Sequence, residues 1–569
     1  MSQASRRPDH LIVPPRPPET VMRLERMGSF HQTRLSFMRG LMRRMKSENW
    51  AFDRPVWRLD KKGVGVAVYT AQCPDRTYSL VCFSHDLDPE LHTDRSIATA
   101  WDATFTLFDG IPSEADIARL SRSVPKQEAG RVSGTELSIS RANRSVRLFG
   151  HTVARLAAGL QPDTEQMDAI GYLMRTTAVY GSGKFGAASR DIIADRPELK
   201  RPFQVEMLSV YLTRAFTADL VEYLAKARSP ETAVPIEPSL RRKIGVGNST
   251  GLGMAPFLVT HPILVNNWMA AREEALARVR SLPGAEAAKI ARFESHLAQA
   301  KAGVDGWATG HEGQTARIAV LRDDLERLTA QLGSGAWHGE FPWDGLYRWG
   351  ETTLSLEGQE LLVSLLIEPH GDLVDDLIDQ MIADESAGFS IDGAMKIGEL
   401  KVVLADVHGW ALDIPFDEPE SQARYWYVLQ NKLEPRLGER VDDPQATQHE
   451  VPLSVGRDMA AMARDLENWR DAQPLAHFLL RHPEYRHVAR RAQIAARHTY
   501  AEIRDNLLAA DMLPIDLLRC KLSFFGAVKF DPRSDRWVRI NMFQNAPYPH
   551  ELASSDADEW IYPSVENAI

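Results

Sequence analysis

Two segments near the middle of the chain carry the pattern that most constrains the fold. Over 285–309 and 314–333, apolar residues recur at alternating spacings of three and four, the a/d pattern of helices that pack along one face. The short stretch TGHEG separates the two segments. The pattern predicts an antiparallel helical hairpin. Because each segment holds only about three heptads, we expect it to pack on the body or on a second subunit.

Other segments predict a chain that is mostly helical. A Leu or Phe at every fourth position over 203–227 predicts a long helix. We also expect helices over 96–108, 137–160, 164–178, 453–470 and 486–509. Runs rich in β-branched and aromatic residues predict strands over 63–70, 77–84, 397–416 and 520–543, the last with a hairpin turn at DPRS.

The fold class predicted from these patterns is α+β, predominantly α-helical, with small β-hairpin or sheet elements and an inserted antiparallel helical hairpin. Four segments follow along the chain. They are a basic N-terminal arm and helix (1–50), an N-terminal α+β body (51–262), the helical hairpin insertion (263–335) and a C-terminal α+β region that packs on the body (336–569).

Composition narrows the class of protein. The 569 residues carry a net charge of −10, which argues against broad nucleic-acid binding, since a phosphate-binding surface needs an excess of Lys and Arg. The first 50 residues are a local exception, with ten Lys and Arg against four Asp and Glu. The chain has three cysteines without a CxxC pair and no apolar run of membrane-spanning or signal-peptide length, which predicts a soluble cytoplasmic protein.

The stretch GVGNSTGLGM (245–254) is the first candidate binding site. A dinucleotide-binding loop needs an apolar strand before it and a P-loop needs Lys followed by Ser or Thr, and neither is present. Glycines at a helix start let backbone N–H groups converge on an anion. We therefore expect an anion beside the basic run 241–243, held by Gly247, Asn248, Ser249, Thr250 and Gly251. The alternative is a structural glycine turn.

The sixteen residues GNSTGLGMAPFLVTHP (247–262) loosely resemble the mobile serine loop of the fumarase/aspartase lyases, which has the form G-S-S-x-M-P-x-K-x-N-P. Independently of this resemblance, we expect Ser249 or Thr250 to hydrogen-bond the substrate or to take part in proton transfer. This stretch has two inserted glycines, lacks the substrate-binding lysine, and has His261 where the family has Asn. We therefore do not assign the chain to that family.

A second candidate is RTTAVYGSGKFGAASRD (175–191). Its GSGK is not a P-loop, because Phe185 follows the lysine. A lysine between glycines can approach a carbonyl or an anion closely, so Lys184 is a candidate nucleophile or point charge, with Arg175 and Arg190 as substrate-binding residues. The alternative is a glycine turn with a solvated lysine. Both glycine-containing stretches flank the helix 203–227, so they can share a pocket.

Three histidines are candidate general bases, because imidazole exchanges protons near neutral pH. They are His85, His261 and His408. No HxxxH or HExxH spacing occurs, so we expect no metal site, and the sequence identifies no cofactor.

These observations favour an enzyme that acts on a small anionic metabolite, carboxylate or phosphate, with lyase or transferase chemistry slightly ahead. The alternative is a non-enzymatic scaffold that uses the helical hairpin and the N-terminal arm to bind a partner or to form a homo-oligomer. RNA binding through residues 1–47 is a weaker third hypothesis.

Overall fold

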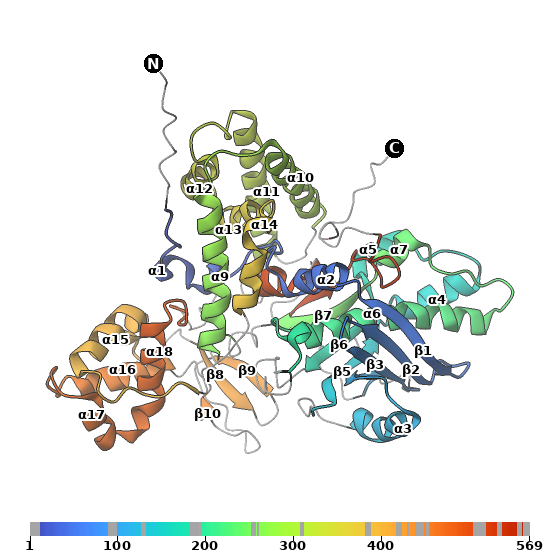
Figure 1. Cartoon of the computed structure of the whole chain (residues 1–569), viewed down its shortest axis with the longest axis horizontal. Coiled ribbons are helices and arrows are strands. Elements are labelled where there is room, and N and C mark those ends of the chain that lie inside the picture. The colour runs from blue at the N-terminus through green and yellow to red at the C-terminus, as the bar shows by residue number, and fades with distance from the viewer. Residues whose placement is uncertain are drawn as a thin grey trace.

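A sheet with its own helices, a helical body beside it and a second helical unit make up the chain in this computed structural model (Figure 1). The structure describes residues 12–88, 100–126, 133–180, 193, 195–251, 258, 261–307, 312–381, 388–416, 424–429, 432–437, 449–450, 455–504, 519–527, 529–531, 537–554 and 560.

The main sheet has nine strands in the order β1-β2-β3-β4-β5-β6-β7-β12-β11. All neighbouring pairs are antiparallel except β6 and β7, which run parallel. The strands are β1 (Ala51–Leu59), β2 (Gly65–Gln72), β3 (Thr77–Ser84), β4 (Ala103–Asp109), β5 (Glu136–Arg144), β6 (Tyr172–Tyr180), β7 (Gly245–Gly251), β11 (Lys529–Asp531) and β12 (Trp537–Met542). The predicted strands over 63–70 and 77–84 are therefore present. Within the predicted range 520–543, β11 pairs antiparallel with β12, but Lys521–Phe525 is π-helical, and the turn at DPRS lies largely outside the described residues.

Helix α6 (Gln204–Arg228) covers one face of the sheet, as the leucine spacing predicts. Its first four turns are buried on every side, and the Phe216 ring meets the rings of Phe105 and Trp57 from the sheet. The opposite face is covered over β2–β4 by α3 (Glu114–Ser123) and the turn Val124–Lys126. The smaller helices around the sheet are α2 (Phe37–Ser47), α4 (Phe149–Ala157), α5 (Thr164–Ile170), η6 (Pro197–Leu199) and α7 (Pro238–Arg242).

The expectation of small β elements is wrong, because the sheet is large. Three ranges predicted as helices overlap strands: β4 overlaps 96–108, β5 overlaps 137–160 and β6 overlaps 164–178. The last two predicted ranges join a strand to a helix, so their apolar residues do not belong to one element. Central strands covered on both faces also lack a clear alternation of polar and apolar residues, so their period is hard to separate from that of a helix.

The helical body contains the predicted hairpin. Helices α10 (Ala287–Asp305) and α11 (Glu312–Gly333) are antiparallel, since Lys301 pairs with Glu326 at 2.7 Å while Arg322 donates to the carbonyl of Val304 at 3.0 Å. Both pack against α13 (Leu356–Ile367). The other helices of the body are α9 (Pro262–Arg280), α12 (Pro342–Thr353), α14 (Gly371–Val374) and η7 (Asp375–Met381). The apolar face of the hairpin is therefore used inside the molecule.

The second helical unit has an apolar core of its own, between α15 (Ile397–Leu412), α16 (Val455–Leu466), α17 (Leu475–Arg481) and α18 (Arg486–Arg497). Helices α16 and α18 were predicted. The predicted strand over 397–416 is wrong: the buried positions of α15, which include Leu400, Leu404 and Val407, recur every three or four residues. A three-stranded sheet completes the described chain, with β8 (Arg424–Leu429) between β10 (His449–Glu450) and β9 (Lys432–Leu437).

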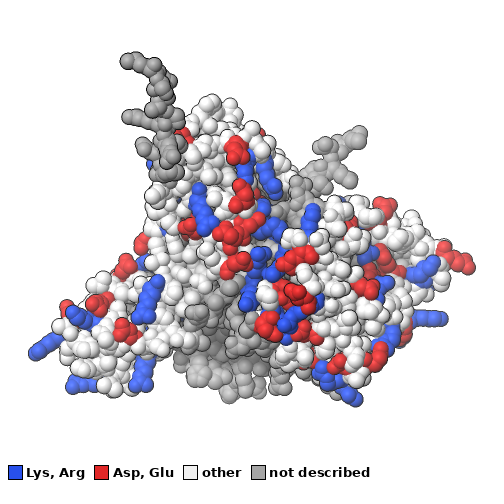
Figure 2. Space-filling view, viewed as in Figure 1, with Lys and Arg blue, Asp and Glu red and all other residues white. Residues whose placement is uncertain are grey.

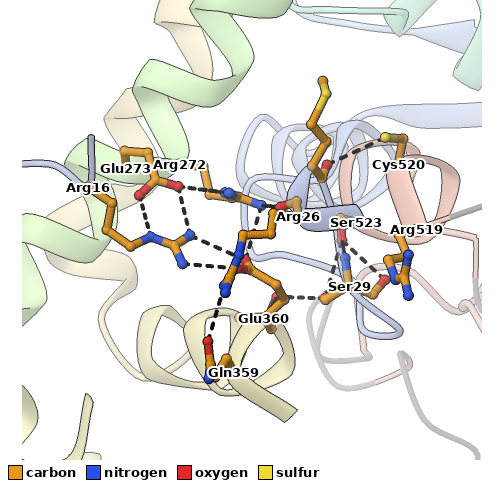
Figure 3. A network of polar contacts seen from close by, with 12 residues as sticks. Arg16, Arg26, Ser29, Arg272, Glu273, Gln359, Glu360, Arg519, Cys520 and Ser523 are labelled. Atoms are coloured by element: carbon orange, nitrogen blue, oxygen red, sulfur yellow. Dashed lines mark hydrogen bonds and ion pairs between the residues drawn. The ribbon is translucent and has the colours of Figure 1, made fainter. Parts of the chain in front are cut away.

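The N-terminal strap, which we define as residues 12–36, is built into the body. It includes α1 (Pro18–Val21) and the turn Leu24–Arg26. The Arg16 guanidinium donates to both oxygens of Glu273 at 2.7 and 2.9 Å and to both oxygens of Glu360 at 3.0 and 3.2 Å (Figure 3). The Ser29 N–H donates to Ser523 Oγ at 2.7 Å in the π-helical segment Lys521–Phe525. The basic side chains expected to form an arm thus neutralise acids inside the protein, while the boundaries of the four predicted segments stay predictions.

Candidate functional site

The glycine-rich stretch 245–251 is strand β7, so the prediction of a glycine nest at a helix start is wrong. The reason is close packing from distant parts of the chain. A Cβ atom on Gly247 would lie 2.7 Å from the Tyr172 ring, and one on Gly245 would lie 2.8 Å from the carbonyl oxygen of Met542. Glycine is needed at these positions because its neighbours leave no room for a side chain.

The structure brings four residues of the two stretches together across β6 and β7. Arg175 is the register partner of Gly247. The Thr176 hydroxyl donates to the carbonyl of Gly247 at 3.3 Å, and the Asn248 amide donates to Thr176 Oγ1 at 3.0 Å. The backbones of Ser249, Thr250 and Gly251 pair with β12. Lys184 and Arg190 lie outside the described residues, so a pocket shared by the two stretches stays a prediction.

The three candidate histidines lie in three different places. His85 follows β3, where its Nε2 atom lies 3.0 Å from Thr104 Oγ1 and burial lowers its pKa. His261 is the N-cap residue of α9. His408 is fully buried in α15 of the second helical unit, and burial lowers its pKa to about 4. These positions place the histidines on separate elements.

A groove of about 730 Å³ runs between β1, the second half of α6, and the segment 548–550. We call it the Asp219 groove. Its wall on α6 consists of side chains that share one face of this helix: Leu212, Ala215, Asp219, Glu222, Tyr223 and Lys226. Aromatic rings form much of the opposite wall and the floor: Trp50, Phe52, Trp57, Tyr69 and Tyr548.

Asp219 is the centre of the groove's polar contacts. Its Oδ2 atom accepts from Arg54 Nη1 at 2.8 Å and from the Tyr69 hydroxyl at 2.7 Å, while Oδ1 pairs with Arg241. Burial raises the pKa of Tyr69 well above its usual value, and Asp219 raises it further, so Tyr69 acts as a donor. Burial lowers the pKa of Arg54, but Asp219 and Tyr69 outweigh that effect and leave it raised.

Arg241 is held from several sides. It donates to Glu222 Oε1 at 2.8 Å and pairs with Asp219, and its guanidinium lies 4.9 Å from the centre of the Tyr548 ring. The neighbouring Arg242 pairs with Glu551 and Lys243 pairs with Asp168. The basic run expected to flank an anion is therefore already neutralised by acids.

Sequence reasoning missed this groove. Two signals were present: the acids Asp219 and Glu222, three apart on the helix predicted over 203–227, and the basic run 241–243 that follows this helix in the chain. Nothing in the sequence shows that β1 and residues 548–550 close the groove around them.

Searches with family models, curated proteins and solved structures found no match to this chain. In the part of the chain that the structure describes, no helix is long and apolar enough to cross a membrane. Within that same part, no group of three or more His, Cys, Asp or Glu is placed to hold a metal ion.

Proposed function

We propose that this protein is an enzyme that binds a small anionic molecule, a carboxylate or a phosphate, in the Asp219 groove. The volume of about 730 Å³ lies within the usual range for small-molecule sites. Aromatic walls with a few convergent polar groups are also typical of such sites. The assignment of lyase or transferase chemistry stays a prediction.

The observation that carries the proposal is one hydrogen-bond donor in the groove, on Arg241, that the acids around it leave unused. Asp219 already accepts from three donors, and Glu222 accepts from Arg241 and from the backbone N–H of Ile236. The Nε–H of Arg241 is buried and has no hydrogen-bond partner. Lys226, at the rim, donates to a backbone carbonyl, that of Pro230. Because Asp219 and Glu222 are occupied while Arg241 keeps an unused N–H, an acceptor-rich anion is the favoured guest.

Catalysis would need a group that exchanges protons in the groove. His550 is exposed and lies beside Pro549 among the residues that line the groove, and an imidazole can both accept and donate a proton. We therefore assign His550, rather than the three histidines named from the sequence, as the candidate acid or base.

A thermal-shift screen of carboxylate and phosphate metabolites tests the proposal. Ala51 is exposed and lines the groove, so Ala51→Trp fills it without disturbing the core. Ala472, exposed in the second helical unit, gives the matched control Ala472→Trp. We expect a compound that raises the melting temperature of the wild type and of Ala472→Trp, but not of Ala51→Trp. The proposal fails if no compound stabilises the wild type, or if Ala51→Trp responds equally.

The scaffold alternative has less support, because the apolar faces of α10 and α11 pack on α13 instead of standing free. Nucleic-acid binding has little support as well, since Figure 2 shows acidic and basic side chains interspersed on the face it draws. We further propose a cytoplasmic location, which the three buried free thiols support, since none of them forms a disulfide. A homo-oligomer formed through the hairpin stays a prediction.

A further inference from the structure

A β-bulge in strand β1 determines which side chains face the Asp219 groove. Asp53 pairs with Thr70 and Val56 pairs with Val68, so two residues of β1, Arg54 and Pro55, lie opposite the single residue Tyr69 of β2. A bulge shifts the alternation of side chains by one position. Proline is tolerated here because β1 is an edge strand of the sheet.

The bulge brings a cation and a large aromatic ring to the same side of β1. Before it, Phe52 faces α6 and contacts Tyr211; after it, Trp57 faces α6 and contacts Phe216. Arg54 therefore lies on the α6 side too, with its guanidinium 4.5 Å from the centre of the Trp57 ring. Arg58 points to the opposite face, where it pairs with Glu114 of α3 at 2.8 Å.

Of the three donors to Asp219, Arg54 is the least firmly held. The side chain of Arg241 is 16% exposed and pairs with two carboxylates, and Tyr69 is buried. The side chain of Arg54 is 44% exposed and has one carboxylate partner. An exposed ion pair of this kind contributes little stability, so its exchange for another anion costs little.

We infer that Arg54 can exchange its partner: its guanidinium moves away from Asp219 and binds the anionic group of a flat aromatic ligand. The ring of the ligand then takes the place of the guanidinium over the Trp57 ring. We call this arrangement the Arg54 clamp. This inference rests on the proposed function and adds the class of ligand, an aromatic carboxylate or phosphate ester. The guanidinium fork matches both oxyanions, which are the shared chemistry of the two. Asp219 keeps Arg241 and Tyr69 as donors after the exchange, so no buried charge is left unpaired.

Titration calorimetry with defined probes tests the clamp. The probes are 2-naphthoate and 1-naphthyl phosphate, with 2-naphthalenemethanol as the neutral aromatic and hexanoate as the non-aromatic anion. Arg54→Ala is compared with Arg58→Ala, which removes an arginine of the same strand that is 49% exposed and also forms a 2.8 Å ion pair. Arg54→Lys keeps the charge but removes the fork.

We expect both naphthyl anions to bind the wild type more tightly than the neutral and the non-aromatic probes do. Arg54→Ala should weaken their binding by about tenfold or more and Arg54→Lys by less, while Arg58→Ala changes it less than about twofold. Because the substituted side chains are exposed, an unchanged circular dichroism spectrum should verify that each variant is folded.

The possible outcomes distinguish a failure of the proposed Arg54 exchange from a failure of the proposed groove function. If Ala51→Trp blocks the naphthyl anions but Arg54→Ala binds them as the wild type does, the clamp is overturned and the groove function stands. If hexanoate binds as tightly as 2-naphthoate, the aromatic class is overturned. If no naphthyl anion binds the wild type, the inference fails, whereas the proposed function is decided by the metabolite screen.

Discussion

Arg16 in the N-terminal strap and Arg54 in the Asp219 groove both pair with carboxylates, but in opposite surroundings. The Arg16 side chain is 5% exposed, and its guanidinium lies between two carboxylates, Glu273 and Glu360, that are almost fully buried. Burial lowers the pKa of Arg16, but the two carboxylates outweigh that effect and leave it raised well above its usual value. Arg54 is 44% exposed and has one such partner.

The difference separates charges that hold the fold from charges that can receive a ligand. A buried ion pair whose donors and acceptors are all used cannot release a partner without leaving a charge in the protein interior. A half-exposed pair can, because water or another anion compensates the charge. The exposure of an arginine's ion pair, and the hydrogen-bond donors that stay unused beside it, therefore indicate a binding site better than the presence of an arginine alone does.

The largest effect is expected from Arg16→Met. It leaves Glu273 and Glu360 buried with fewer donors, and loss of one partner from a buried ion pair costs about 3–5 kcal/mol. Chemical denaturation measures the loss of unfolding free energy. A loss of unfolding free energy under about 1 kcal/mol would show that the ion pairs of Arg16 stabilise the fold no more than the exposed ion pair of Arg54 does.

The second effect is a pH dependence that originates in the strap. Burial lowers the pKa of His31 from its usual 6.5 to about 4, although Glu368 opposes the shift. The unfolded chain therefore takes up this proton first, so stability is complete above pH 6.5 and declines as the pH falls toward 4. The loss between pH 7 and pH 5 is about 2 kcal/mol for this histidine.

The variant His31→Leu checks this effect, because it should lose about 2 kcal/mol less than the wild type over that pH interval, measured by denaturation at each pH. His370 and His408 contribute to the remaining decline, since burial lowers the pKa of each to about 4. The carboxylates act at lower pH: burial raises the pKa of Glu273, but Arg16 and Arg272 outweigh it and bring it to about 2. An unchanged pH profile in His31→Leu would contradict the assignment.

A smaller effect is expected in the groove from Tyr69→Phe. The variant removes the hydroxyl that donates to Asp219 at 2.7 Å, while Arg54 and Arg241 remain. A hydrogen bond to a charged group contributes about 1.5 kcal/mol at the low end of its range. If Tyr69→Phe lost as much unfolding free energy as Arg16→Met, Asp219 would be as desolvated as Glu273. The groove and the N-terminal strap would then not differ in how far their charged groups are removed from water.

The smallest effect is expected from Arg54→Ala, which should change the free energy of unfolding by less than about 1 kcal/mol. Arg58→Ala should have a similarly small effect, because the Arg58 side chain is 49% exposed and its partner Glu114 is 74% exposed. Denaturation midpoints of the two variants, measured side by side, check this. A cost of several kcal/mol for Arg54→Ala alone would mean that Arg54 holds the fold and is not exchangeable.

Local patterns predicted the elements whose partners are close in sequence. The heptads of α10 and α11 each reflect one helix face that packs continuously. The leucine spacing of α6 predicted the helix itself, although its first four turns are buried on every side. The same reasoning failed for β4–β6, because most of their described residues are buried, so these strands do not alternate like half-exposed strands. It also failed for α15, where apolar and β-branched composition was given more weight than the spacing of three and four.

The groove could not be predicted because it depends on contacts between distant segments. Arg54 of β1 and Asp219 of α6 are separated by 165 positions, and Tyr548 lies near the other end of the chain. The glycines of β7 were misinterpreted for the same reason, since Tyr172 and Met542 explain them only after the sheet has formed. Sequence periodicity carries no information on either contact.

A crystal structure of the protein with 1-naphthyl phosphate tests the exchange at Arg54 most directly. The account predicts that the phosphate oxygens lie within hydrogen-bond distance of Arg54, that the naphthyl ring lies against Trp57, and that Asp219 keeps Arg241 and Tyr69 alone. A ligand bound elsewhere, with Arg54 still on Asp219, would contradict it.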